Sequence, residues 1–277
     1  MADEHRFRKR LQCHHCGYEE PAPVNCPACN NADTLVACGP GVERIAEEVI
    51  GQLPDVRFEI MTSDTMRGPE AAQRLVYAVE NHEIDLLIGT QMVAKGHHFP
   101  NLTLVGIIDA DLGLAGGDLR AAERTYQVLQ QVSGRAGRAE RPGHVLIQTF
   151  QPEHPVMRAL ANGDRDGFMA LETDARRAGA WPPFGRLAAV IVSSRDPDLA
   201  DGLAGALARC APYGDGVRVL GPAPAPLALL RGRHRRRLLL KADRDVPIQG
   251  MMRRWLAQVR IPSNARVRVD IDPYSFL

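Results

Sequence analysis

Apolar runs alternate with amphipathic stretches from residue 36 to residue 180. The amphipathic stretches repeat apolar residues at helical spacing and predict helices over residues 42–50, 69–82, 118–132, 154–161 and 164–177. The apolar runs have the length of buried strands and lie at residues 56–61, 84–89, 102–109 and 143–150. Strands that alternate with helices are typical of a parallel sheet with helices on both faces. We therefore predict an α/β domain over residues 36–180.

The order of elements changes after the boundary Trp181-Pro182-Pro183-Phe184. Strands are predicted at residues 186–194, 217–220, 228–231, 236–242 and 265–271. Helices are predicted at residues 198–210 and 246–259. Helices packed on one face of a mixed sheet would give an α+β domain over residues 181–277.

The first 35 residues carry two Cys-x-x-Cys pairs with turn-forming residues between them. The pairs are Cys13 with Cys16 and Cys26 with Cys29, separated by nine residues. Four thiolates at this spacing can close a tetrahedral zinc site, because each turn presents two sulfur atoms to one ion. A disulfide or free thiols are the alternatives, and a cytosolic chain disfavours the disulfide. We therefore predict a module over residues 1–35 that binds structural Zn2+.

The composition is that of an ordinary globular protein of 277 residues, with 45% hydrophobic and 24% charged residues. No apolar run approaches the ~20 residues needed to cross a bilayer, and residues 1–10 are too charged for a signal peptide. We therefore expect a cytoplasmic protein with no membrane partner. The net charge of +1 is unevenly divided, since residues 1–180 carry 18 basic and 25 acidic side chains and residues 181–277 carry 16 and 8. The basic C-terminal part indicates contact with a polyanion.

The stretch Gln131-Val132-Ser133-Gly134-Arg135-Ala136-Gly137-Arg138 ends the helix predicted over residues 118–132. Its two arginines stand three residues apart, so both guanidinium groups can reach one polyanion. Its two glycines let the backbone approach that polyanion closely. The alternative is a helix end whose solvated arginines are favoured by the helix dipole alone. The neighbouring sequence favours the polyanion.

The apolar run at residues 84–89 opens into a loop of hydroxyl, amide and cationic residues, which includes Thr90, Gln91, Lys95, Gly96, His97 and His98. This loop and the arginine stretch together resemble motifs V and VI of superfamily 2 helicases. The sequence Lys95-Gly96-His97-His98-Phe99-Pro100 is similar to the corresponding motif of the PriA family of primosomal, replication-restart helicases. The resemblance extends from the cysteine pairs to Asp270-Ile271-Asp272-Pro273. An ordered series of motifs is far more specific than a lone Gly-Arg-x-Gly-Arg.

The resemblance implies that residues 36–180 form the second RecA-like lobe of a motor that binds ATP and Mg2+ between two lobes. By that resemblance Arg138 is the arginine finger, with Arg135 and Gln131 beside the γ-phosphate. The nucleotide side of the cleft corresponds to Gly134, Gly137, Asp64 and Gly96. The DNA side corresponds to Thr90, Gln91, Lys95, His97 and His98, which would hold phosphates without reading sequence. The motifs of the first lobe, Gly-x-x-x-x-Gly-Lys-Ser/Thr and Asp-Glu-x-His, do not occur in this chain.

Asp109 and Asp111 follow a predicted strand, and ligands collect at the carboxyl ends of parallel strands. The two residues do not form the magnesium-binding Asp-Glu-x-His box of these motors. We weigh a structural or cleft-lining role above a catalytic role.

The most basic run of the C-terminal part is residues 231–237. The family's C-terminal domain resembles the ribosomal S10-like fold and contacts DNA, so we predict that Arg233, Arg235 and Arg237 contact phosphates. The alternative is a solvated charged surface, as most charge runs are. The family also implies a zinc module with two metal ions on twice as many cysteines. The two cysteine pairs are then either half-sites of different ions or partners in one site.

The resemblance implies an ATP-dependent DNA helicase of 3′-to-5′ polarity that restarts stalled replication forks, with this chain as its C-terminal half. We expect this chain alone not to hydrolyse ATP. The implied partners are branched forks, single-stranded DNA, the single-stranded-DNA-binding protein and other primosome proteins. Two alternatives stay open: a zinc-bearing DNA-binding and primosome-assembly module without motor activity, and a sister motor such as a branch-migration helicase. The cysteine pairs and the motif at residues 95–100 argue against the sister motor.

Overall fold

The computed structural model describes most of the chain beyond residue 40 and short segments before it. The described residues are 3–5, 10–12, 19–21, 23–25, 29–31, 41–62, 65–66, 68–90, 99, 101–114, 118–137, 142–214 and 216–274. None of the helices in these ranges combines the length and the apolar character that a bilayer-spanning helix needs.

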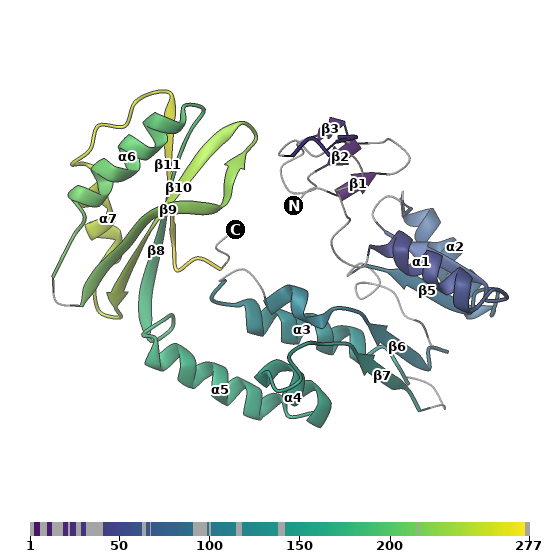
Figure 1. Cartoon of the computed structure of the whole chain (residues 1–277). Coiled ribbons are helices and arrows are strands. Elements are labelled where there is room, and N and C mark those ends of the chain that lie inside the picture. Colours follow the sequence, from purple (N-terminus) through teal and green to yellow (C-terminus); the bar gives the residue numbers. More distant parts are fainter. Residues whose placement is uncertain are drawn as a thin grey trace. The chain divides into compact units, whose positions relative to one another are not determined.

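The chain divides into two compact units, and each is described here by itself (Figure 1). The central unit comprises residues 38–169, and the other unit comprises residues 1–37 and 170–277. The domain boundaries predicted after residues 35 and 180 stay predictions.

Three short strands lie near the amino terminus. Asp3–His5 (β1), Arg10–Gln12 (β2) and Glu19–Pro21 (β3) form an antiparallel sheet in the order β1-β2-β3. Most of the turn and cysteine residues between β2 and residue 41 lie outside the described ranges.

The central unit begins with two helices around a parallel strand pair. Phe58–Met61 (β4) and Leu86–Gly89 (β5) run in parallel, from the pair Phe58 and Leu86 to the pair Met61 and Gly89. Val42–Gln52 (α1) packs beside β5. Pro69–Glu80 (α2) joins the two strands, and proline suits its first turn because the proline nitrogen needs no hydrogen-bond acceptor there. The parallel arrangement predicted from the sequence is confirmed for this pair.

A second parallel pair follows in the same unit. Leu104–Ile107 (β6) and His144–Ile147 (β7) run in parallel and are joined through a short 3-10 helix, Ala110–Leu114 (η1), and Ala121–Ser133 (α3). One continuous parallel sheet was predicted, but the described strands form two separate pairs. Parallel pairing needs only a helical crossover between two strands, whereas joining the two pairs needs contacts that the described residues do not make.

The apolar core of the central unit lies where α3 meets two further helices. These are Pro155–Asn162 (α4) and Arg165–Ala178 (α5), close to the predicted ranges. Tyr126 of α3 stacks on Phe168 of α5 with 4.5 Å between ring centroids, and Leu129 and Val156 are buried beside them. Burial of such large side chains contributes about 1.5–3 kcal/mol each. This core fixes α3 and therefore the segment that follows it.

The C-terminal domain, residues 185–271, is a four-stranded sheet with two helices. Its strands are Gly185–Ser194 (β8), Val217–Leu230 (β9), Arg233–Asp243 (β10) and Ala265–Ile271 (β11), in the sheet order β11-β8-β10-β9. Its helices are Pro197–Arg209 (α6) and Ile248–Leu256 (α7). All neighbouring strands are antiparallel, so the prediction of a mixed sheet was wrong. The strands predicted at 217–220 and 228–231 are parts of the single strand β9.

Both helices of this domain pack on one face of the sheet, as predicted. Val190, Leu238 and Leu207 are fully buried in their common core. Trp255 of α7 is 1% exposed, and its indole nitrogen donates a hydrogen bond of 2.9 Å to the carbonyl oxygen of Leu207 in α6. That carbonyl lies in the last turn of α6, where helix carbonyls lack helical partners. We call this side of the sheet the inner face and the opposite side the outer face.

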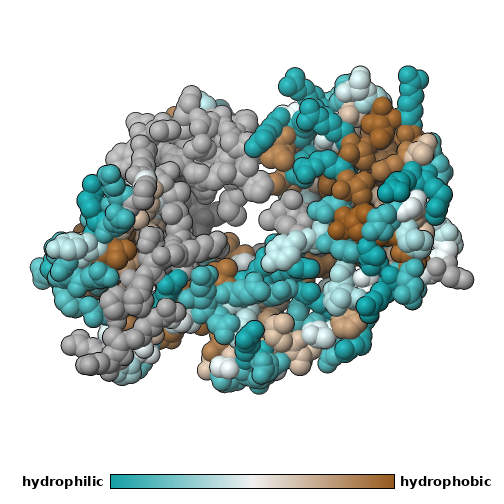
Figure 2. Space-filling view, turned by 180° about the vertical axis from the view of Figure 1, so that it is seen from behind, coloured by the Kyte–Doolittle hydropathy of each residue, from teal (hydrophilic) through white to brown (hydrophobic). Residues whose placement is uncertain are grey.

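A tight turn joins β9 to β10. Arg231 and Gly232 both have positive φ angles, 51° and 69°, and Leu230 pairs with Arg233. Two positive φ values match the right-handed twist of a two-residue hairpin turn. The basic run therefore lies on a hairpin. Seen from behind, the surface of this domain shows a group of apolar residues bordered by hydrophilic ones (Figure 2).

Candidate functional site

Helix α3 leads into the arginine stretch. It begins at Ala121 and not directly after Asp118, whose carboxylate accepts hydrogen bonds from the Arg120 N–H (3.0 Å) and the Arg124 guanidinium (2.6 Å). Asp118 therefore stabilises the first turn from outside the helix. At the other end, the backbone nitrogen of Arg135 donates to the Val132 carbonyl at 3.0 Å. The predicted helix before the arginines is confirmed.

The turn after α3 is attached to the end of the other candidate stretch. Gly137 has φ +71° and donates a backbone hydrogen bond of 3.0 Å to the carbonyl of Leu102. Leu102 lies two residues after the stretch at 95–100, and Phe99 of that stretch is buried with 2% exposure. The structure therefore places the turn after α3 beside Leu102, two residues beyond the second stretch.

The predicted catalytic residues differ in their surroundings. Gln131 is exposed on α3, whereas Arg135 is half-buried. Gly134 ends the helix as its C-cap, and both Gly134 and Gly137 are exposed. Arg138, the predicted arginine finger, lies outside the described residues. The roles of these side chains at a nucleotide stay predictions.

Thr90 lies at the carboxyl end of β5, where it is exposed. Because Met61 pairs with Gly89, the next residues, Thr62 and Thr90, follow at the same edge of the strand pair. The Thr65 hydroxyl donates to the Ile60 carbonyl at 2.8 Å and accepts a hydrogen bond of 2.9 Å from the Thr62 backbone nitrogen. Six predicted site residues of these loops lie outside the described residues: Asp64, Gln91, Lys95, Gly96, His97 and His98.

Asp111 has a structural environment. Its carboxylate accepts hydrogen bonds from the Thr149 hydroxyl and the Phe150 backbone nitrogen, both at 2.7 Å. These bonds tie η1 to the segment after β7, and both oxygens of Asp111 are engaged. The contacts support the structural interpretation of Asp111 over the catalytic one.

The structure describes one of the four predicted zinc ligands. Cys29 is exposed and is not part of a disulfide. Cys13, Cys16 and Cys26 lie outside the described residues, so the metal site stays a prediction from their spacing.

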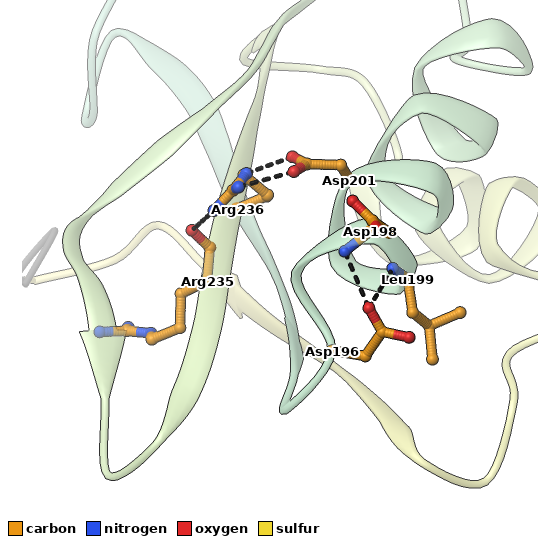
Figure 3. A network of polar contacts seen from close by, with 6 residues as sticks. All are labelled: Asp196, Asp198, Leu199, Asp201, Arg235 and Arg236. Carbon is orange, nitrogen blue, oxygen red and sulfur yellow. Dashed lines mark hydrogen bonds and ion pairs between the residues drawn. The ribbon is translucent and has the colours of Figure 1, made fainter.

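The basic run of the hairpin divides between the two faces of the sheet. Arg236 points to the inner face and forms a two-bond ion pair with Asp201 of α6, with 2.7 Å between its Nη2 and Oδ2 of Asp201 (Figure 3). The hydrogen bonds raise the pKa of Arg236 and lower the pKa of Asp201. Arg235 points away from this pair, as the alternation of a strand requires (Figure 3). Arg236 therefore holds α6 on the sheet.

The three predicted DNA-binding arginines lie on the outer side of β10. The Arg235 guanidinium donates to the Leu227 carbonyl at 3.3 Å. Burial lowers the pKa of Arg235 from its ordinary value, and the nearby charge of Arg268 lowers it further. Arg233 donates to the Ser193 carbonyl at 2.9 Å and so ties the hairpin to the end of β8. Arg237 is half-buried.

Sequence reasoning missed two arginines of β11, Arg266 and Arg268. Both are exposed, and they are separated from β10 by β8 alone. The alternating pattern Ala265-Arg266-Val267-Arg268-Val269 already indicates one basic and one apolar face. The sequence contained no signal that this face lies beside Arg235 and Arg237, because strand order is decided by packing.

Two family models match the chain. The model of the helicase conserved C-terminal domain matches residues 31–140, and the model of the primosomal protein N C-terminal domain matches residues 177–274. The α/β content and these matches define the class: a helicase C-terminal domain joined to a primosomal-protein C-terminal domain. The chain belongs to the PriA family of replication restart proteins.

The similarity to curated relatives extends over nearly the whole chain. The chain is 44% identical over 272 residues to the replication restart protein PriA of Rickettsia felis, and 37% identical over 278 residues to that of Bacillus subtilis. It is 33% identical over 276 residues to that of Haemophilus influenzae. These alignments cover 98%, 99% and 97% of this chain, but 42%, 34% and 37% of those proteins. The chain thus spans less than half the length of these relatives.

Proposed function

We propose that the chain is the C-terminal half of an ATP-dependent DNA helicase of 3′-to-5′ polarity that restarts stalled replication forks. The helicase family match and the similarity to proteins named as replication restart proteins support this proposal. The observation that carries it is the hydrogen bond from the Gly137 nitrogen to the Leu102 carbonyl, which is 3.0 Å long. This bond holds Gly137 of the arginine stretch against Leu102, which follows the stretch at residues 95–100 in the sequence.

The proposed role of the arginine stretch is electrostatic. Bound ATP with Mg2+ would supply the γ-phosphoryl group, which passes to water with ADP as the leaving group through a transition state whose negative charge is spread over the phosphoryl oxygens and the leaving oxygen. Arg138 would stabilise that charge, with Arg135 and Gln131 beside it, and Gly134, Gly137, Asp64 and Gly96 would line the nucleotide side. A guanidinium suits this role because it stays charged and offers several donors in a fixed plane.

The proposed DNA contacts lie in both units. In the central unit, hydroxyl, amide and cationic groups would hold backbone phosphates, through Thr90, Gln91, Lys95, His97 and His98. In the C-terminal domain, Arg233, Arg235 and Arg237 would add phosphate contacts. Branched forks and single-stranded DNA are the proposed substrates, and the single-stranded-DNA-binding protein and other primosome proteins are the proposed partners. A cytoplasmic location follows from such substrates in a bacterial cell.

The proposal includes a structural zinc site. Cys13, Cys16, Cys26 and Cys29 would bind Zn2+ as thiolates, either in one site or as parts of two sites. Zinc in such a site stabilises a small fold that has too little apolar core of its own.

The test uses the full-length protein with Arg138→Ala. We expect DNA-stimulated ATP hydrolysis to fall by ~10³-fold or more, since an arginine finger is worth that much in phosphoryl transfer. DNA affinity should stay near that of the wild type. Arg158→Ala is the matched control, because Arg158 lies on α4 with its side chain 66% exposed and the charge change is the same.

Two results would count against the proposal, and a third would show only that the variant has misfolded. Equal rates of ATP hydrolysis by the Arg138→Ala and wild-type proteins would show that Arg138 is not the arginine finger. Joint loss of ATP hydrolysis and DNA affinity would indicate misfolding and not finger chemistry. A wild-type protein that binds forks without hydrolysing ATP would support the alternative, a zinc-bearing DNA-binding and primosome-assembly module.

A further inference from the structure

The two edges of the C-terminal sheet differ in their capacity to pair with a further strand. In the sheet order β11-β8-β10-β9, the described strands place β9 at one edge and β11 at the other. β9 carries prolines at three alternate positions, Pro222, Pro224 and Pro226. A proline nitrogen has no hydrogen to donate, so prolines hinder the addition of a strand at an edge. The sequence of β11 contains no proline, and its edge can therefore accept a strand.

The backbone groups that β11 presents at this edge follow from one hydrogen bond. The Asp272 nitrogen donates to the Leu187 carbonyl of β8 at 2.8 Å. In an antiparallel strand, the N–H and C=O of one residue point to the same side, and the side alternates along the chain. The even-numbered residues of β11 therefore direct their backbone groups to β8. Val267, Val269 and Ile271 direct theirs to the free edge, where they pair with no strand among those described.

The side chains of β11 alternate between apolar and charged. Val269 pairs with Val190 on the inner face and is still 37% exposed. Arg266, Arg268 and Asp270 lie on the outer face and are exposed. Among the described residues, none of these three side chains forms a hydrogen bond or an ion pair. The edge thus offers unpaired backbone groups together with charges of both signs.

A second copy of β11 matches this edge in one register. A two-fold symmetric pairing is antiparallel and centres on one residue, which lies opposite itself. A centre on Val269 places Arg268 of each copy opposite Asp270 of the other. A centre on Val267 places the two arginines beside it opposite each other, and a centre on Ile271 does the same with two aspartates. A centre on any charged residue of β11 places that charge opposite itself.

We propose that β11 is an interface between two copies of this chain, joined through antiparallel β11 strands centred on Val269. Arg268 and Asp270 then form two opposite-charge pairs across the interface, and such pairs stabilise an antiparallel ladder, whereas like charges destabilise it. The backbone of Val269 exchanges hydrogen bonds with its counterpart. The contact is confined to one strand of seven residues, so we expect a weak, concentration-dependent dimer. This inference goes beyond the proposed function, which does not involve self-association.

The test is sedimentation equilibrium of the 277-residue chain without DNA or nucleotide. The average mass of the wild type should rise with protein concentration, from that of one chain towards that of two. Arg268→Asp and Asp270→Arg should each keep the mass of one chain at concentrations at which the wild type associates. In each variant the residues at positions 268 and 270 carry the same charge, so they repel each other across the interface.

A mixture of the two variants tests the register. In equal amounts, Arg268→Asp and Asp270→Arg should associate with each other, because every pair across the interface again joins opposite charges. The matched controls are Arg244→Asp and Asp245→Arg, which make the same charge changes at two exposed residues of the turn between β10 and α7. Each control alone should associate as the wild type does. Circular dichroism shows whether each variant has kept its fold.

Four outcomes would overturn the inference. A wild-type chain with the mass of one chain at every concentration excludes the dimer. Association of the Arg268→Asp or Asp270→Arg variant alone, equal to that of the wild type, places the interface away from β11. Folded variants that do not associate when mixed exclude the register centred on Val269. Loss of association in the Arg244→Asp and Asp245→Arg controls attributes the effect to net charge and not to β11.

Discussion

Gly137 and Gly143 pack backbone against backbone, and neither position has room for a side chain. A Cβ atom on Gly137 would lie 2.5 Å from the Gly143 nitrogen, and a Cβ atom on Gly143 would lie 2.3 Å from the Gly137 nitrogen. The contact places the turn after α3 against the residue that precedes β7. This glycine contact and the hydrogen bond from Gly137 to Leu102 both fix the position of Gly137, the residue before Arg138.

Gly143→Ala should displace this turn. The added methyl group meets backbone atoms of Gly137 and Ala136, which cannot move aside as a flexible side chain would. We expect the free energy of unfolding to fall by about 1–3 kcal/mol, the usual cost of overpacking. In the full-length protein, DNA-stimulated ATP hydrolysis should fall with little change in DNA affinity. Urea unfolding and a steady-state ATPase assay measure the two effects.

Gly106→Ala is the control for this substitution. Gly106 lies in the neighbouring strand β6, and a Cβ atom there meets nothing within 4 Å. Its stability should stay within ~0.5 kcal/mol of the wild type. Equal stability and equal activity of the Gly143 and Gly106 variants would show that the turn does not depend on the glycine contact.

Arg57 and Asp85 form an exposed ion pair that joins the starts of β4 and β5. The Arg57 guanidinium donates to the two oxygens of Asp85 at 2.6 and 2.8 Å, and the Arg57 backbone nitrogen donates at 3.1 Å. The side-chain hydrogen bonds, followed by the backbone bond, lower the pKa of Asp85 to about 2. The folded state therefore holds the carboxylate in its charged form more strongly than the unfolded state does.

The lowered pKa predicts the direction of a pH effect. Stabilisation by the pair should be fully present above the ordinary carboxyl pKa of 3.8 and should be lost as the pH falls towards about 2. Arg57→Gln should return the Asp85 pKa towards its ordinary value and shift acid unfolding of the central unit to higher pH. Carboxyl titration by NMR provides the measurement. A pKa near 3.8 for Asp85 in the wild-type protein would show that Asp85 does not form the ion pair with Arg57.

Metal analysis tests the cysteine module. We expect zinc to co-purify with the chain and Cys29→Ser to reduce the zinc content, because removal of one thiolate opens a tetrahedral site. Cys210→Ser is the matched control, since the Cys210 thiol contacts the Ala206 carbonyl at 3.3 Å at the end of α6. Atomic emission measures the metal directly. Equal zinc content in both variants, or a wild-type chain without zinc, would argue against binding by Cys29.

Local patterns in the sequence predicted most elements. Helical spacing of apolar residues placed α2, α3 and α5 within a few residues of their observed ends, and the run of alternating elements predicted the parallel pairs of the central unit. These features depend on neighbours a few residues apart, so a linear reading captures them. The family, too, was predicted from ordered motifs and is confirmed by the matches.

The candidate site was only partly predictable. The sequence identified the arginine stretch and the loop at residues 90–98, but not the hydrogen bond that joins Gly137 to Leu102. The predicted mixed sheet is antiparallel, because β11 returns to pair with β8 at the edge of the sheet and not with β10, its predecessor in the chain. Pairing between strands far apart in sequence depends on which apolar faces pack together, and no local pattern contains that information.

The basic run illustrates the division best. By itself the sequence determined that residues 231–237 are basic, that residues 265–271 alternate, and that the C-terminal part carries net positive charge. Only the tertiary structure decided that Arg236 forms an ion pair with Asp201 on one face of the sheet. It also decided that Arg235 lies on the other face, in register with Arg266 across β8. The physical reason is that burial of Val190, Leu238 and their neighbours under two helices sets the register, and the register then assigns every charged side chain to a face.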